Sequence, residues 1–202
     1  MAQAPSHLIP IEAAVTLDGL FRERAKRTPE HVAYRAYNEE HKNWREYTWA
    51  QIDHQVARWQ SAMEKDGLKA GDRVAVMLKN CPEWVIYDQA ALGLGMVTVP
   101  LYTQDRAENV SYIIANAGCK ALLIEGLDQW KELAGVRSQL GGLVRIVSLN
   151  PIPDAGDPRV QSLAHWLPES GGETRHLPRD PNALATIVYT SGTTGRPKGV
   201  ML

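Results

Sequence analysis

A loop close to the last residue of the sequence carries the residue types that bind phosphate: TSGTTGRPKG, residues 190–199. Gly192, Gly195 and Gly199 lack Cβ atoms and permit positive φ, so the backbone can point several N–H groups at one anion. Lys198 supplies a mobile positive charge of the kind that contacts phosphate. These features predict a site for a polyphosphate and its magnesium ion. Four hydroxyl side chains add hydrogen-bond donors for phosphate or ligands for a hard cation: Thr190, Ser191, Thr193 and Thr194.

The loop differs from the Walker A phosphate loop, in which serine or threonine follows the lysine and a helix begins. Here Gly199 follows Lys198, and the apolar residues 200–202 indicate a strand. Residues 183–190, ALATIVYT, indicate a buried strand before the loop. The sequence therefore predicts two strands joined by a phosphate-binding clasp. A flexible linker is the alternative, which the lysine, the proline and the apolar strands on both sides disfavour.

A regular alternation of strands and helices precedes the loop and must position it. Between residues 68 and 149, apolar or β-branched runs lie at 73–78, 96–101, 120–125 and 143–149. Helical patterns separate them at 83–93, 107–118 and 127–136. Runs that are apolar on both faces and alternate with helices indicate an α/β fold, with a parallel sheet flanked by helices on both faces. Ligands of open α/β sheets bind at the carboxyl ends of strands, where the strand at 183–190 delivers the loop.

The pattern as a whole predicts a partial domain over residues 1–202. Thr48 and Gln51 have the spacing of a capping box that starts a helix. The proline-rich connection is predicted as a surface segment with one short helical turn near 160–167. The predicted parts are a helix, hairpin and helix at 14–67, strand–helix repeats at 68–149, the connection at 150–182, and strand, loop and strand at 183–202.

Composition and charge narrow the classes of partner. The formal net charge is −1, and no basic face is interleaved with stacking aromatics, so we expect no nucleic-acid partner. The basic residues of the predicted helix at 16–27 are interpreted as a solvated face. Cys81 and Cys119 form no closely spaced pair, and no signal peptide is recognisable, so we expect a cytoplasmic location. A peripheral membrane contact stays open.

The loop and the residues before it also resemble a known family. TSGTTGRPKG, at 190–199, is similar at nearly every position to the phosphate loop of the adenylate-forming enzymes. These are acyl-CoA synthetases, luciferases and the adenylation domains of peptide synthetases. Upstream, YTWAQIDHQVARW, GLKAGDRVAVMLKNCPEWVIYDQAALGLGMVTVPLY and YIIANAGCKALLIE resemble the N-terminal part of long-chain fatty acid CoA ligases. The resemblance covers most of residues 16–202 and implies the N-terminal part of the large domain of the adenylate-forming fold.

The resemblance implies a two-step ligase reaction. A long-chain fatty acid carboxylate would attack the α-phosphate of ATP, giving acyl-adenylate and pyrophosphate, and coenzyme A would then displace AMP to give a thioester. It further implies that Thr190 contacts Mg²⁺ or phosphate, that Ser191 to Lys198 wrap the β- and γ-phosphates, and that Lys198 is catalytic. The alternatives are an adenylating enzyme for another carboxylic acid and a non-catalytic nucleotide-binding module.

Enzymes of this family are several hundred residues long, so the resemblance also implies that these 202 residues are a fragment. We expect the fragment alone to be inactive. Apolar surface left exposed on it would promote self-association into a homo-oligomer.

Overall fold

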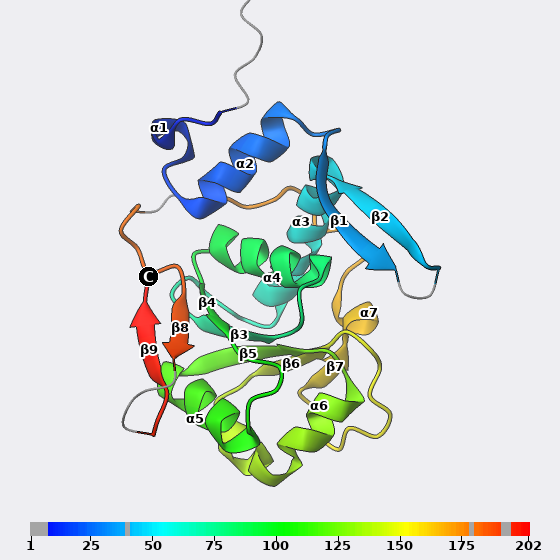
Figure 1. The fold of residues 1–202 in the computed structure, drawn as a ribbon, viewed down its shortest axis with the longest axis vertical. Coiled ribbons are helices and arrows are strands. Elements are labelled where there is room, and N and C mark those ends of the chain that lie inside the picture. The colour runs from blue at the N-terminus through cyan, green and yellow to red at the C-terminus, as the bar shows by residue number, and fades with distance from the viewer. Residues whose placement is uncertain (1–7, 39–40, 178–179, 191–194) are drawn as a thin grey trace, which may run out of the picture.

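The computed structural model describes residues 8–38, 41–177, 180–190 and 195–202, and at its centre lies a parallel β-sheet (Figure 1). Its strands are β3 (Arg73–Met77), β4 (Val97–Pro100), β5 (Cys119–Ile124), β6 (Arg145–Ser148) and β7 (Val160–Ser162). They lie in the order β4-β3-β5-β6-β7, and each neighbouring pair is parallel. The predicted parallel sheet is therefore confirmed.

Helices cover both faces of this sheet, as predicted. One face carries α3 (Trp49–Lys65) and α4 (Pro82–Gly93); the other carries α5 (Ala107–Ala117), α6 (Leu127–Glu132) and the 3-10 helix η1 (Leu133–Leu140). Alternation along β3 separates the two cores, because Val74 and Val76 pack with α3 and α4 while Ala75 and Met77 pack with α5 and α6. The α-helix predicted at 127–136 is wrong beyond Glu132, where η1 replaces it.

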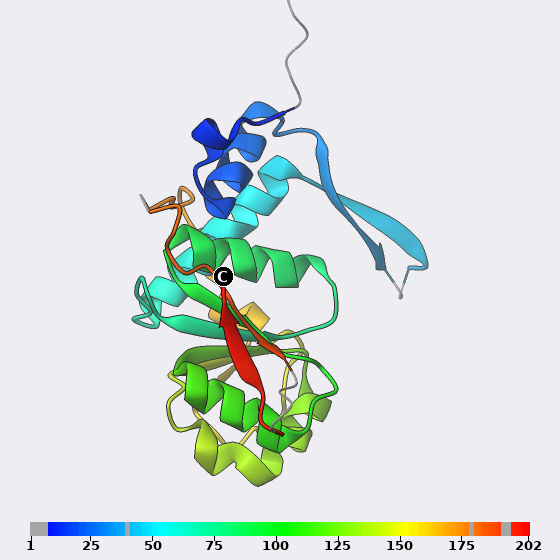
Figure 2. The same cartoon turned by 60° about the vertical axis from the view of Figure 1, so that its left-hand side comes forward.

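The N-terminal segment folds as helices on either side of a hairpin, as its patterns predict. The first elements are α1 (Ile11–Ala14), α2 (Leu17–Arg27), β1 (Val32–Asn38) and β2 (Asn43–Thr48). β1 and β2 pair antiparallel, and Figure 2 shows this hairpin extending away from the sheet. Thr48 and Gln51 form the predicted capping box at the start of α3. In the described part of the chain, no helix is long and apolar enough to cross a membrane.

The connection at 150–182 contains a strand that the sequence analysis did not predict. β7 is three residues long and pairs with β6 at the edge of the sheet, with Val160 opposite Ile146. A half-buried segment of three residues is too short to show the alternation that identifies a strand. The predicted helical turn is confirmed as α7 (Leu163–Trp166), which follows directly.

Residues 168–177 then run across α3 and α4. The buried amide of Gln60 makes two hydrogen bonds with the main chain of Arg175: Arg175 N donates to Gln60 Oε1 at 2.7 Å, and Gln60 Nε2 donates to Arg175 O at 2.9 Å. The next residue, His176, has its Nδ1 3.0 Å from Asp18 Oδ1 of α2. These contacts hold the connection against α2 and α3 as it passes from the β7 edge of the sheet to the β4 edge.

The strand pair predicted around the loop is present as β8 (Ile187–Thr190) and β9 (Lys198–Met201), which are antiparallel. The strand predicted over 183–190 is wrong in its first half, because residues 183–186 do not pair with β9 as part of β8. β8 runs beside β4, where Thr98 and Thr186 form an isolated parallel bridge. The Thr186 hydroxyl also donates to the Thr98 carbonyl oxygen at 2.9 Å. Because β8 is parallel to the central strands, it ends at Thr190 on the same edge of the sheet as the carboxyl ends of those strands.

An ion pair at the start of β7 predicts a pH effect on stability. Arg159 Nη2 lies 2.6 Å from Asp157 Oδ2, and hydrogen bonds from Arg159 lower the pKa of the Asp157 carboxyl. A carboxyl with a lowered folded-state pKa stabilises the protein above its unfolded pKa, and that contribution is lost as the pH falls through the folded pKa. We expect Asp157→Asn to lower the free energy of unfolding at neutral pH, with the gap to wild type closing below about pH 4. Urea unfolding across pH measures this gap, and a gap independent of pH would contradict the prediction.

Candidate functional site

The strands β8 and β9 bring two of the predicted site residues together. Thr190 and Lys198 are directly opposite each other in the antiparallel register, and both are exposed. Directly opposite residues of an antiparallel pair project from the same face. The Thr190 hydroxyl and the Lys198 ammonium group are therefore available to one ligand at the mouth of the loop. Gly195, the remaining described member of the predicted set, has φ +83°.

The other loop residues with predicted roles lie outside the part of the chain that the structure describes. They are Ser191, Gly192, Thr193 and Thr194. The assignments of Thr190 and Lys198 to phosphate and magnesium also stay predictions, because they concern contacts with ligands.

Contacts on the opposite face of the β8–β9 hairpin explain why position 199 is a glycine. Gly199 pairs with Tyr189, whose ring is buried at 5% exposure. A Cβ built on Gly199 would lie 2.8 Å from Ile187 Cγ2 and 3.0 Å from Tyr189 Cζ. Gly199 is not among the glycines with positive φ, so the conformational reason given from the sequence is wrong for this position. Close approach of the Tyr189 and Ile187 side chains is the reason instead.

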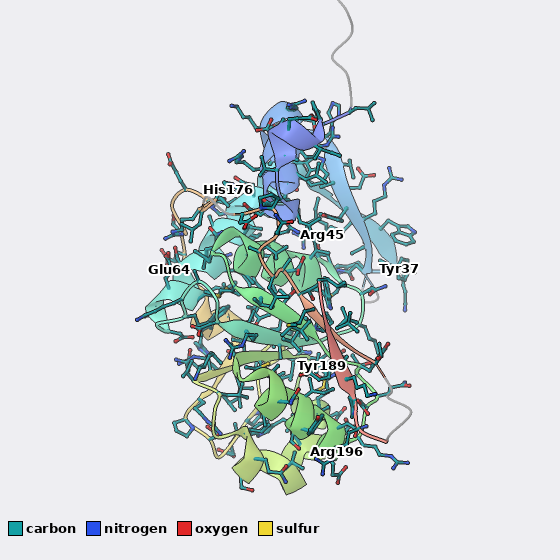
Figure 3. All side chains as sticks on the ribbon, turned by 90° about the vertical axis from the view of Figure 1, so that its left-hand side faces the viewer. Tyr37, Arg45, Glu64, His176, Tyr189 and Arg196 are labelled. Atoms are coloured by element: carbon teal, nitrogen blue, oxygen red, sulfur yellow. The ribbon has the colours of Figure 1, made fainter. Side chains whose placement is uncertain are left out.

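Helix α5 contacts the chain on both sides of the loop. The Tyr189 hydroxyl donates a hydrogen bond to Asn116 Oδ1 at 2.5 Å, and burial raises the pKa of Tyr189. Beyond the loop, the guanidinium carbon of Arg196 lies 5.6 Å from the centre of the Tyr112 ring. Figure 3 labels Tyr189 and Arg196 on the hairpin. Sequence reasoning missed Tyr112 and Asn116, because their distance from the loop along the chain hides the contact.

A polar groove lies at the edge of the sheet where β8 ends. It has a volume of about 420 Å³ and is lined by residues after β3, β4, β5 and β6, among them Lys79, Gln104, Glu125 and Asn150. The buried Gln129 holds the main chain of one lining residue in place, because its Oε1 accepts a hydrogen bond from Glu125 N at 2.7 Å. The position of the groove at the carboxyl ends of parallel strands is where α/β folds bind ligands. The sequence analysis named none of these residues.

Among the described residues, Thr190 offers a candidate ligand for a magnesium ion. No group of three or more His, Cys, Asp or Glu side chains in the described ranges is placed to hold a metal ion. Thr190 offers an exposed hydroxyl oxygen at the end of β8. Mg²⁺ usually keeps several waters and is bound through one or two protein oxygens together with substrate phosphates, so the Thr190 hydroxyl fits as one of its ligands.

Comparisons with known proteins connect this chain to a family. Residues 21–202 match the family model described as AMP-binding enzyme. Fatty acyl-CoA synthetase A from Dictyostelium discoideum is 35% identical over 154 residues, covering 70% of this chain and 22% of that protein. A 2-succinylbenzoate–CoA ligase from Bacillus licheniformis is 33% identical over 181 residues, covering 89% of this chain and 32% of that protein. The chain thus spans less than a third of the length of these relatives.

A solved structure shows the same fold. The anthranilate CoA ligase AuaEII, in complex with anthranoyl-AMP, aligns with a TM-score of 0.81 over 96% of this chain and 35% of its own. At 19% identity this likeness establishes the fold, that of the adenylate-forming enzymes. Because the family model matches from residue 21 to residue 202, nearly the whole sequence, this chain belongs to the AMP-binding enzyme family.

Proposed function

We propose that the protein carrying this chain activates a carboxylic acid with ATP and then transfers the acyl group to coenzyme A. The observation that carries this proposal is the placement of Thr190 opposite Lys198, both exposed, at the mouth of the TSGTTGRPKG loop in a chain of the AMP-binding enzyme family. Hydroxyl and ammonium groups on one face at the carboxyl edge of an α/β sheet suit a polyphosphate.

The chemistry asks the loop to stabilise charge on the leaving group. A carboxylate oxygen attacks the α-phosphorus of ATP, and the bond from that phosphorus to the bridging oxygen breaks. The electron pair of that bond leaves with pyrophosphate. Lys198 and the loop N–H groups would face the developing charge, because preorganised donors act most strongly where charge appears. Magnesium, when bound, supplies further positive charge to the phosphates.

Thr190 has a separate part in this proposal. Its hydroxyl oxygen would ligate the magnesium ion or donate to a phosphate oxygen. Since Thr190 is the last residue of β8, its position is set by the strand rather than by the loop. In the second step the thiol of coenzyme A attacks the acyl carbonyl and AMP leaves, which forms the thioester.

We propose a long-chain fatty acid as the acyl substrate. The relative named as a fatty acyl-CoA synthetase supports this choice. The relative named for 2-succinylbenzoate favours an aryl acid as the second candidate, because it matches the chain at nearly the same identity. A non-catalytic nucleotide-binding module is the third candidate, since the same loop would bind ATP without turnover.

Carboxylate-dependent ATP–pyrophosphate exchange tests the proposal and separates the three candidates. The natural protein that carries this chain would be assayed with fatty acids of graded length, aryl acids and amino acids. We expect exchange that is strongest with long fatty acids. Exchange with aryl or amino acids alone would retain adenylation and reject the fatty acid. ATP binding without exchange for any acid would leave the binding module.

A further inference from the structure

We propose that Tyr112 and Asn116 of α5 are positioning residues for the phosphate loop. We call these two residues the anchor pair. The proposal rests on the proposed function and adds a role for residues that do not themselves reach a substrate. The anchor pair would hold the chain at one point before the loop and at one point after it, so that Thr190 and Lys198 face the same ligand.

The anchor pair occupies one face of α5. Residues four apart on a helix are neighbours on its surface, so Tyr112 and Asn116 stand one turn from each other. Asn116 accepts a 2.5 Å hydrogen bond from the hydroxyl of Tyr189, which directly precedes Thr190. Tyr112 presents its ring to the guanidinium group of Arg196, which directly follows Gly195, at 5.6 Å. A single rigid helix therefore contacts both ends of the loop.

Among the described residues, the other contacts of the hairpin with the sheet lie at the start of β8, away from the loop. Next to β8, the chain meets the central sheet at an isolated bridge between Thr98 and Thr186. Two hydrogen bonds accompany this bridge, from Thr98 N to Ala185 O and from the Thr186 hydroxyl to Thr98 O, but no ladder of pairs follows along β8. Every residue of β9 is exposed. Because these backbone contacts lie at one end of β8, side-chain contacts hold the other end of the hairpin, next to the loop, against the rest of the protein. Tyr189 is the buried side chain nearest to the loop that can do so.

Tyr189 links α5 to both strands of the hairpin. On β8 it is bonded to Thr190. On β9 its ring lies against Gly199, where even a Cβ atom would come within 3.0 Å of Tyr189 Cζ. Gly199 in turn follows Lys198, so a shift of the ring moves both predicted ligand-contacting residues. Catalytic groups displaced by about 1 Å lose much of their effect, which makes this support relevant to rate.

The two contacts differ in chemistry, and each can be removed without removing the other. The Tyr189 hydroxyl remains a neutral donor across the physiological range, because burial raises the pKa of Tyr189. The Arg196 guanidinium group lies over the face of the Tyr112 ring, a cation–π contact. Conservative variants that preserve each contact are available: Asn116→Asp keeps an oxygen acceptor, and Tyr112→Phe keeps the ring.

Amide hydrogen exchange tests the anchor pair without using activity. In Asn116→Leu we expect exchange of the β8 and β9 amides to accelerate by about fivefold, the effect of losing one net hydrogen bond. In Tyr112→Leu we expect about threefold, the effect of losing one exposed cation–π contact. The β3 and β5 amides should not change in either variant. Hairpin exchange that stays at wild-type rates in both leucine variants would overturn the proposal.

ATP–pyrophosphate exchange then separates a positioning role from general support of the fold. We expect the leucine variants to raise the KM for ATP and lower kcat, while the KM for the carboxylic acid stays within about twofold. Asn116→Asp and Tyr112→Phe should restore both values. A Tyr112→Phe variant that behaves like Tyr112→Leu would overturn the role of the ring.

A double-mutant cycle connects the two ends of the hydrogen bond. Tyr189→Phe and Asn116→Leu should together cost no more than either alone, because both remove the same bond. Fully additive effects would contradict the assignment.

If wild type shows no pyrophosphate exchange with any acid, the proposed function fails. The affinity for magnesium pyrophosphate, measured by calorimetry, then tests the anchor pair by itself. A loss of about fivefold in the leucine variants would then support it, and unchanged affinity would overturn it.

Discussion

Replacing Lys198 by alanine is expected to slow carboxylate-dependent adenylation by about two to three orders of magnitude, the scale for losing one preorganised charge-stabilising donor. Lys198 is exposed and lies opposite Thr190 in the register of β8 and β9, so its ammonium group is free to move onto a phosphate. The lost interaction forms as negative charge moves to pyrophosphate. We therefore expect kcat to fall more than the KM for ATP rises.

The control for Lys198→Ala is an exposed lysine far from the loop. Lys26 lies in the last turn of α2, and in Figure 1 this helix is at the top of the structure, well above the start of β9. Its removal changes the net charge by the same amount. We expect Lys26→Ala to exchange pyrophosphate at the wild-type rate. Both variants should unfold at the same urea concentration as wild type, because neither side chain is buried. A rate for Lys198→Ala within a few-fold of wild type would remove Lys198 from the proposed role.

The central part of the fold could be predicted because its signals are local. Strands such as β3 and β5 are short apolar runs, and the helices between them repeat their apolar residues at helical spacing. β7 could not be predicted in this way. Its three half-buried residues show no period, and it is a strand only because β6 offers it an edge to pair with. Long-range pairing of this kind leaves no mark within three residues.

In the candidate site, too, residues with a local signal could be predicted and residues joined by long-range contacts could not. The loop residues could be recognised from the sequence because glycines, hydroxyls and a lysine lie within ten positions. The residues that hold the loop could not. Asn116 is 73 positions from Tyr189, and neither asparagine nor tyrosine is unusual on a helix or strand. The reason for Gly199 was equally hidden, since it depends on the Tyr189 ring lying across that position.

Replacing Asp66 by alanine is expected to lower the free energy of unfolding by about 3 kcal/mol, the low end of the range for breaking a buried ion pair. Asp66 ends α3 and is 9% exposed at its side chain, and its partner Arg145 of β6 is 17% exposed. Arg145 donates to both carboxylate oxygens, at 2.8 Å and 2.6 Å, and Trp166 Nε1 donates to Oδ2 at 2.7 Å. Alanine would leave a guanidinium group and an indole N–H without their acceptor.

The β1–β2 hairpin contains a second ion pair that serves as a control for Asp66→Ala. It has nearly the same separation but is much more exposed to water. Arg35 and Glu46 approach to 2.7 Å across β1 and β2, but their side chains are 64% and 50% exposed. Water solvates each of them when its partner is removed, so we expect Glu46→Ala to change the free energy of unfolding by no more than about 0.5 kcal/mol. Urea unfolding at neutral pH measures both variants. Equal losses in the two would mean that separation, not burial, sets the cost of breaking an ion pair in this protein. A loss several times larger for Asp66→Ala would instead mean that the groups left behind, Arg145 and Trp166, supply most of it.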